Sequence, residues 1–182
     1  IDLYTSDKDG GEIWLAGRYS FRDTITYTFS GIEYEGDRGE HRYTLFLPLY
    51  NEVQWMAIGT NEKASFTFEP LSAQLPIVAY GTSITQGACA SRPGMAWTNI
   101  LQRRMGRNVV NMGFSGNAML EASVIDFLAQ IEAKAYIIDA MPNASTMPAD
   151  ILPDTIVKAV QRLRKVRPHT PIILADHLGY PN

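Results

Sequence analysis

The sequence predicts an α/β protein in which a small antiparallel β-domain precedes a parallel sheet with helices. Of the 19 aromatic residues, 13 lie within residues 1–75. The same part carries 6 basic and 12 acidic side chains, whereas residues 76–182 carry 10 and 7. After Pro70 the hydrophobic pattern changes from a period of two to short apolar runs that alternate with helical patterns. We therefore expect two domains, residues 1–72 and residues 73–182.

The first domain is predicted to be a small antiparallel β-sandwich. Residues 24–29, 43–47 and 64–68 alternate polar with apolar, often aromatic, side chains, as half-buried strands do. Turn residues such as those at 30–31 and 50–52 separate these runs. Several short strands at this spacing favour a sandwich.

The second domain is predicted to contain four strands that alternate with three helices, as in successive βαβ units. The predicted strands are the mainly apolar runs 76–80, 108–111, 135–138 and 172–174. Between them, apolar residues recur at helical spacing: Trp97, Leu101 and Met105; Val124, Leu128 and Ile131; and Ile156, Val160 and Leu163, with Pro153 in the first turn of the last helix. Strands and helices that alternate in this way form a parallel sheet with helices on its faces.

Functional residues are expected at the carboxyl ends of these strands, where sites form in open parallel sheets. The segments that leave those ends are 81–87, 112–117, 139–143 and 176–177. Ser83 follows the first strand directly, near backbone N–H groups at the start of a helix. Such a hydroxyl could act as the nucleophile in acyl transfer, although a serine in this place is more often a helix cap or a turn residue.

Gly116 and Asn143 follow the next two strands. A glycine N–H can approach a reacting centre closely, and an asparagine amide supplies a further donor. Each residue alone is more often part of a turn, but together with Ser83 they would form a three-donor oxyanion pocket. The segment is not the nucleophile elbow of α/β-hydrolases, because Thr85 stands where the second glycine would be. No phosphate-binding loop and no Gly-x-Gly-x-x-Gly motif occurs.

Three segments together resemble the first three blocks of the SGNH (GDSL-type) hydrolases: 81–85, 113–117 and 141–143. The leading segment resembles the N-terminal β-domain of one branch of these esterases, through Asp2-Leu3-Tyr4 and residues 45–51. The resemblance implies a flavodoxin-like α/β/α domain, with Ser83 as the nucleophile. The Ser83 N–H, the Gly116 N–H and the Asn143 amide would then form the oxyanion hole. Thr82 replaces the Asp of the GDSL motif, which is not part of the catalytic triad in that family.

The family carries its general base in an Asp-x-x-His block, and no such block occurs in this sequence. Of the three histidines, His41 lies in the β-region and His169 at the amino end of its strand. His177 leaves the correct strand end beside Asp176, but neighbouring side chains diverge, so this Asp is poorly placed to orient it. We expect the catalytic Asp and His after Asn182, which would leave the α/β domain incomplete at its C-terminal end; His177 is the alternative base.

Arg92, Asp176 and His177 are candidates for lining the substrate pocket, with an exposed loop arginine as the simpler interpretation of Arg92. The chain starts at Ile1 rather than Met, and we expect it to be a piece of a longer protein. The family resemblance favours a secreted or periplasmic location.

Composition excludes several other classes. The net charge of −3 is too small to suggest a nucleic-acid binder, and one cysteine excludes internal disulfides and a multi-cysteine zinc site. No apolar run reaches the roughly 18–20 residues of a membrane span. We expect a serine esterase for small acyl esters, such as acetyl esters on carbohydrates, that needs no metal or cofactor. The alternative is a non-catalytic carbohydrate-binding or assembly protein with the same fold.

Overall fold

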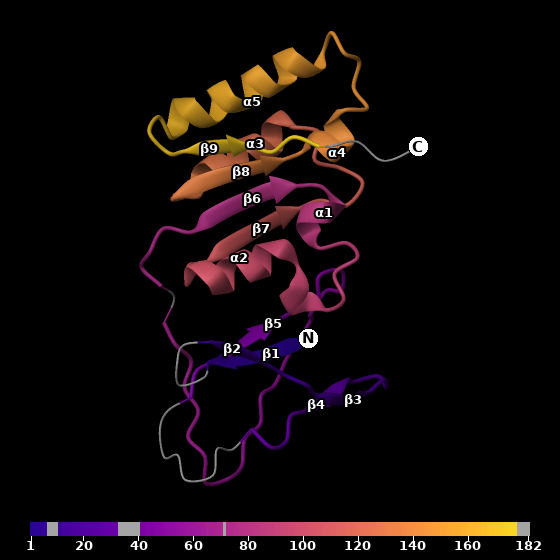
Figure 1. The fold of residues 1–182 in the computed structure, drawn as a ribbon, viewed down its shortest axis with the longest axis vertical. Coiled ribbons are helices and arrows are strands. Elements are labelled where there is room, and N and C mark those ends of the chain that lie inside the picture. Colours follow the sequence, from indigo (N-terminus) through magenta and orange to yellow (C-terminus); the bar gives the residue numbers. More distant parts are fainter. Residues whose placement is uncertain (7–10, 33–40, 71, 178–182) are drawn as a thin grey trace.

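The structure is a computed structural model and describes residues 1–6, 11–32, 41–70 and 72–177. A parallel sheet with its helices forms one end of the molecule, and small antiparallel sheets form the other end (Figure 1). This arrangement confirms the predicted α/β fold class with antiparallel strands at the N-terminal side.

Four parallel strands form the central sheet: β6 (Ile77–Gly81), β7 (Val109–Gly113), β8 (Ala135–Asp139) and β9 (Ile172–Leu174). Their spatial order is β7-β6-β8-β9, so β6 lies between the two strands that follow it in the chain. All five residues of β6 are buried, as expected for a central strand covered on both faces. The chain changes direction along the sheet at β6, which makes this strand the topological switch point where α/β proteins bind ligands.

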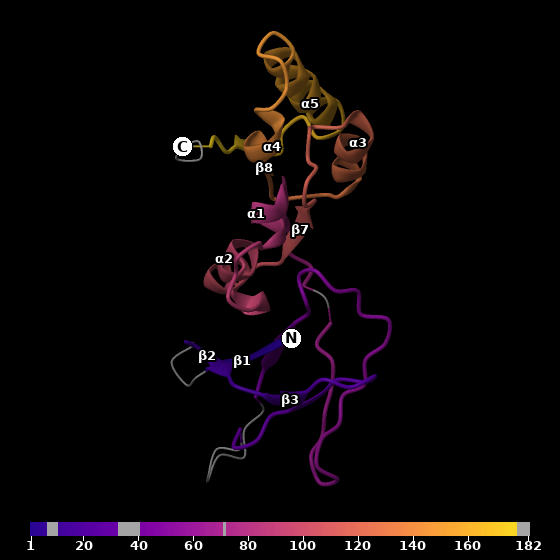
Figure 2. The ribbon, with the colours of Figure 1, turned by 90° about the vertical axis from the view of Figure 1, so that its right-hand side faces the viewer.

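Helices cover both faces of the sheet (Figures 1 and 2). Ile77 and Ala79 face α2 (Trp97–Met105), where they pack with Trp97 and Leu101. Val78 and Tyr80 face α3 (Ala122–Gln130) and α5 (Leu152–Val166), in a larger core that also contains Leu128 and Leu163. The period of two along β6 thus divides its side chains between the two layers.

The predicted inward faces of these helices are confirmed except at Met105, which is 53% exposed. Eight residues of α-helix turn the chain about 80° past a whole number of turns. Met105 therefore points away from the direction of Trp97, and it is also the last residue of α2.

The described residues of the N-terminal part form two small antiparallel sheets. In one, β1 (Asp2–Ser6) lies between β2 (Glu12–Leu15) and β5 (Tyr43–Phe46); in the other, β3 (Arg18–Ser20) pairs with β4 (Thr26–Thr28). The strand predicted at residues 64–68 is wrong, because this segment forms no strand and pairs with none of the strands in the described residues. Instead, the rings of Phe66 and Phe68 pack on one another with their centroids 5.0 Å apart. Packing of the two sheets as a sandwich and the domain boundaries stay predictions.

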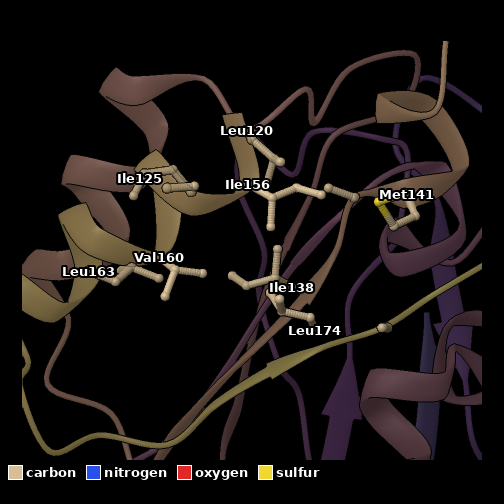
Figure 3. A pocket seen from close by; sticks show the side chains of 11 residues that line it. Leu120, Ile125, Ile138, Met141, Ile156, Val160, Leu163 and Leu174 are labelled. Atoms are coloured by element: carbon tan, nitrogen blue, oxygen red, sulfur yellow. The ribbon is translucent and has the colours of Figure 1, made fainter. Parts of the chain in front are cut away.

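An apolar cavity of about 40 Å³ lies between α5 and the sheet (Figure 3). Ile156 and Val160 of α5 face Ile138 of β8 and Leu174 of β9 across it. This volume exceeds the roughly 10–15 Å³ that one water molecule needs, but the residues that line it are all apolar. The cavity therefore offers no polar side chain to a substrate. In the described residues, no helix combines the length and the apolar character that crossing a membrane requires.

Candidate functional site

The site begins with the tight turn between β6 and the short helix α1 (Ser83–Gln86). Thr82 is the N-cap of this helix, and its side chain accepts a hydrogen bond from the Ile84 N–H at 3.3 Å. Ser83 is the first helical residue and is half-buried, so the cap role considered for it belongs to Thr82. The N–H of a first helical residue has no acceptor within its own helix. Ser83 thus presents both a hydroxyl and a backbone donor at the carboxyl edge of the sheet.

Two glycines let α1 approach the strand ends closely. A Cβ atom at Gly81 would lie 2.2 Å from Thr85 Oγ1 and 2.6 Å from the Asp139 carbonyl oxygen. A Cβ atom at Gly113 would lie 2.1 Å from the Gln86 nitrogen and 2.4 Å from its Cα. Any other residue at these two positions would push α1 away from β6, β7 or β8.

Hydrogen bonds fix α1 to the neighbouring strands. The buried Thr85 hydroxyl donates to Asp139 Oδ2 at the end of β8, at 2.8 Å. On the other side, the Asn111 amide of β7 donates to the Thr85 carbonyl at 2.8 Å and to Thr98 Oγ1 at 2.9 Å. Asn111 Oδ1 also accepts from the Gly113 N–H at 2.9 Å. The turn that carries Ser83 is therefore held between β7 and β8.

The loop after β7 brings Gly116 to the same edge. The Phe114 N–H donates to the Gly81 carbonyl at 2.8 Å, and the Ser115 N–H donates to Gln86 Oε1 at 3.0 Å. Gly116 has a φ of 74°, a conformation that favours glycine. Within the described part of the chain, the N–H groups of Ser83 and Gly116 donate to no other residue. Both donors are thus free to bind a ligand oxygen.

Asn143 lies in the short helix α4 (Met141–Ala144), directly after β8. Its Nδ2 donates to the Asn117 carbonyl of the neighbouring loop at 2.6 Å. A primary amide carries two N–H bonds, so one stays available. The predicted residues Ser83, Gly116 and Asn143 thus follow three strands that lie side by side, and hydrogen bonds link their loops (Figure 1).

Asp176 and His177 lie after β9, two strand positions from β6, or about 10 Å across the sheet. The hydrogen bond between them runs from the His177 backbone N–H to Asp176 Oδ1 at 2.8 Å, so it does not orient the imidazole. His169 precedes β9, so it lies at the amino ends of the strands, on the opposite side of the sheet from Ser83.

Arg92 points toward the N-terminal strands. Its guanidinium lies 4.2 Å from the centre of the Trp14 ring, and its Nε lies 3.4 Å from Asp2 Oδ2. The Arg92 guanidinium also donates to the Tyr4 hydroxyl at 3.2 Å. Asp2 is 4% exposed and accepts from the Gly94 N–H at 2.7 Å. Arg92 and Asp2 therefore join the N-terminal sheet to the loop that follows Ser83.

The N-terminal part also contacts the turn that carries Ser83. Gln86 Nε2 donates to the Leu49 carbonyl at 3.0 Å, and the Tyr50 hydroxyl donates to the Ser83 carbonyl at 3.4 Å. The supporting roles of Gln86, Asp139 and the N-terminal residues were not predicted. The one feature of the sequence that could have indicated such a role is Asp139, a charged residue at the end of an otherwise apolar strand.

No group of three or more His, Cys, Asp or Glu side chains gathers as metal ligands would among the described residues. The fold and site together define a doubly wound α/β protein with a serine and several hydrogen-bond donors at the switch point of its sheet.

Comparison with known proteins assigns the family. Residues 74–182 match the family described as GDSL-like lipase/acylhydrolase, and residues 1–66 match the N-terminus of SGNH-hydrolase-type esterases. This chain belongs to the GDSL-like lipase/acylhydrolase family, which confirms the predicted resemblance.

Two solved structures are similar to this chain. A protein from Bacteroides ovatus, described as GDSL-like lipase, shares 37% identity over 95% of this chain, with a TM-score of 0.79. This chain covers 49% of that protein, or about half its length. The salicylyl-acyltransferase SsfX3 from a tetracycline biosynthetic pathway shares 17% identity, with a TM-score of 0.53, over 64% of this chain and 36% of its own. At 17% identity, the similarity to SsfX3 shows only a shared fold. The search of curated proteins found no match.

Proposed function

We propose that this chain carries the nucleophile and oxyanion donors of a serine esterase for small acyl esters, with acetylated carbohydrates as the substrate class. The observation that supports this most is that Ser83, Gly116 and Asn143 follow three neighbouring strands, with donors of all three available. Family membership adds independent support. The carbohydrate preference rests on the resemblance to the branch of these esterases that has an N-terminal β-domain.

The proposed reaction has two steps. A general base takes the proton of the Ser83 hydroxyl while Oγ attacks the ester carbonyl carbon, and the carbonyl oxygen becomes an oxyanion. The Ser83 N–H, the Gly116 N–H and the second amide N–H of Asn143 stabilise that oxyanion. The alcohol leaves with the proton from the base, and water then releases the acid from the acyl-enzyme. Neither step uses a metal or a cofactor.

The general base is proposed to lie beyond Asn182, because the sequence contains no Asp-x-x-His block. The 182-residue chain alone should then hydrolyse p-nitrophenyl acetate no faster than its Ser83→Ala variant. Turnover that depends on Ser83 would instead assign the base to this chain, with His177 as the first candidate.

The intact protein tests the nucleophile directly. A fluorophosphonate probe should label the wild type and a Ser145→Ala control, in which an exposed serine after α4 is removed, but not Ser83→Ala. Acetate release from acetylated monosaccharides, compared with p-nitrophenyl acetate, then tests the substrate class.

A non-catalytic carbohydrate-binding protein is the second candidate, which the missing Asp-x-x-His block favours. It predicts no labelling at Ser83 and sugar binding that Ser83→Ala leaves unchanged. Labelling that survives in Ser83→Ala would contradict the esterase mechanism.

A further inference from the structure

The loop after β7, residues 114–121, has an unfavourable backbone that its surroundings must hold in place. Gly116, Ala118 and Leu120 have φ values of 74°, 67° and 61°. Residues with a Cβ atom rarely adopt this left-handed conformation, and they keep it only where neighbouring groups fix the chain. Two such residues in this loop indicate that specific contacts determine its path.

A buried tyrosine and a glutamate supply those contacts at the far end of the loop. The Tyr80 hydroxyl donates to Glu121 Oε2 at 2.7 Å and accepts from the Leu120 N–H at 3.0 Å. Glu121 Oε1 accepts from the Met119 N–H at 3.0 Å. Tyr80 is fully buried, and its ring also lies near that of Phe114 at the start of the loop, with the centroids 6.1 Å apart.

The protonation states suit these bonds. Burial, together with the Glu121 carboxylate, raises the pKa of Tyr80, so its hydroxyl stays a donor. Burial alone would raise the pKa of Glu121. The hydrogen bonds from Tyr80 and from backbone N–H groups outweigh it, so the pKa of Glu121 lies below its usual value. A neutral phenol and a charged carboxylate form a strong, charge-assisted pair.

The path of the loop determines where two of the proposed oxyanion donors lie. Gly116 is part of the loop, and the Asn117 carbonyl holds the Asn143 amide at 2.6 Å. Tyr80 lies on β6 three residues before Ser83, so a single strand carries the nucleophile and anchors the loop with the other donors.

We propose that Tyr80 and Glu121 are positioning residues that hold the Gly116 N–H and the Asn143 amide in register with Ser83. They touch neither substrate nor reacting atoms, and the proposal rests on the esterase function proposed above. Loss of the Tyr80 hydroxyl should therefore lower kcat and leave substrate binding nearly unchanged.

The test compares Tyr80→Phe with Tyr136→Phe in the intact protein. Tyr136 lies on the neighbouring strand β8, is also fully buried, and donates to the Ile131 carbonyl at 2.5 Å, away from the loop. Both variants keep the ring and lose a buried hydroxyl. We expect Tyr80→Phe to lower kcat about 10-fold with KM within about twofold, and Tyr136→Phe to leave both unchanged. Thermal unfolding should show comparable losses of stability in the two variants.

Two further variants complete the test. Glu121→Gln keeps an oxygen that can accept one of the two hydrogen bonds, so its kcat should lie between those of the wild type and Tyr80→Phe. The kcat of the double variant Tyr80→Phe/Asn143→Ala should fall by a smaller factor than the product of the two single decreases, because both changes act on the same donor, the Asn143 amide. If Tyr80→Phe does not fold, Glu121→Gln decides the question.

The outcomes separate this proposal from the function on which it rests. Activity that survives in Ser83→Ala would overturn the esterase proposal itself. If Ser83→Ala abolishes activity but Tyr80→Phe and Glu121→Gln keep wild-type kcat, or raise KM alone, the positioning role is wrong. Equal loss of kcat in Tyr80→Phe and Tyr136→Phe would also overturn it, because it would reflect stability alone.

Discussion

The close approach of α1 to β7 gives the most direct test of the site's architecture, through Gly113→Ala. The new Cβ atom would lie 2.1 Å from the Gln86 nitrogen and 2.4 Å from the Gln86 Cα. Carbon and nitrogen atoms in contact normally stay more than about 3 Å apart. Both clashing atoms belong to the backbone, so no side-chain rotation relieves the contact. The backbone of Gly113 is not in the left-handed region, so the cost comes from the contact and not from the conformation.

Extra atoms in a well-packed region typically cost 1–3 kcal/mol, and a clash with backbone belongs at the upper end, at about 3 kcal/mol. For a chain of this size, about 2–4 °C of melting temperature is lost per kcal/mol. We therefore expect Gly113→Ala to melt about 6–12 °C below the wild type. Because β7 and α1 must separate, it should also lose most of any Ser83-dependent activity.

Gly59→Ala is the matched control, because a Cβ atom there meets nothing within 4 Å and the backbone of Gly59 is not left-handed. Replacing glycine by alanine in a compatible backbone reduces the entropy of the unfolded chain and stabilises by about 0.4–1 kcal/mol. Circular dichroism during heating and in urea measures both variants. A melting temperature for Gly113→Ala within about 2 °C of that of Gly59→Ala would refute the close packing of β7 against α1.

Three further predictions concern the same edge of the sheet. Thr85→Val removes a hydrogen bond to the Asp139 carboxylate and should lower the free energy of unfolding by about 1.5–3 kcal/mol in urea. The control is Thr155→Val, which loses an exposed hydrogen bond to the Ile151 carbonyl at the start of α5 and should lower the free energy of unfolding by less than about 0.5 kcal/mol. Similar decreases in the two variants would contradict the role of Thr85. Burial and a neighbouring carboxylate raise the pKa of Tyr80, so the unfolded phenol ionises near pH 10 while the folded one stays neutral. The contribution of Tyr80 to the free energy of unfolding is therefore complete below about pH 10 and decreases above it. In urea titrations, the difference in the free energy of unfolding between wild type and Tyr80→Phe should become smaller from about pH 9 to 11. A constant difference would contradict the raised pKa of Tyr80. In the intact protein, Asn143→Ala should lower the kcat of the proposed ester hydrolysis about 10²–10³-fold with little change in KM. An unchanged kcat would contradict the proposed role of Asn143 as an oxyanion donor.

Much of the parallel sheet could be predicted because its physical causes are local. A strand buried on both faces must be apolar throughout, and residues 76–80 and 135–138 carry that pattern without long-range information. Proline in the first turn of α5 and the spacing of its apolar residues are equally local. The convergence of Ser83, Gly116 and Asn143 followed from one general rule about parallel sheets.

The supporting contacts could not be predicted, because they depend on register and strand order. Tyr80 and Glu121 are 41 residues apart, and nothing in their own surroundings in the sequence marks them as partners. The spacing of Phe66 and Phe68 has the period of a strand, yet a strand also needs a neighbour, which local pattern does not supply. Gln86 contacts Leu49 and Ser115 at once, so its role depends on how three distant segments come together.

The bonds that join the strand-end loops span long stretches of chain, and this affects the order of events during synthesis. Thr85 and Asp139 are 54 residues apart, and Asn143 follows Ser83 by 60 residues. At roughly 5–20 residues per second, the ribosome adds Asn143 about 3–12 s after Ser83. During this time the β6 turn lacks the partners that β8 and α4 later supply, since non-local pairings form slowly and late. A nascent chain halted before β8 would therefore contain the serine without its assembled surroundings, and we expect any reactivity of that hydroxyl to appear only once the third strand is in place.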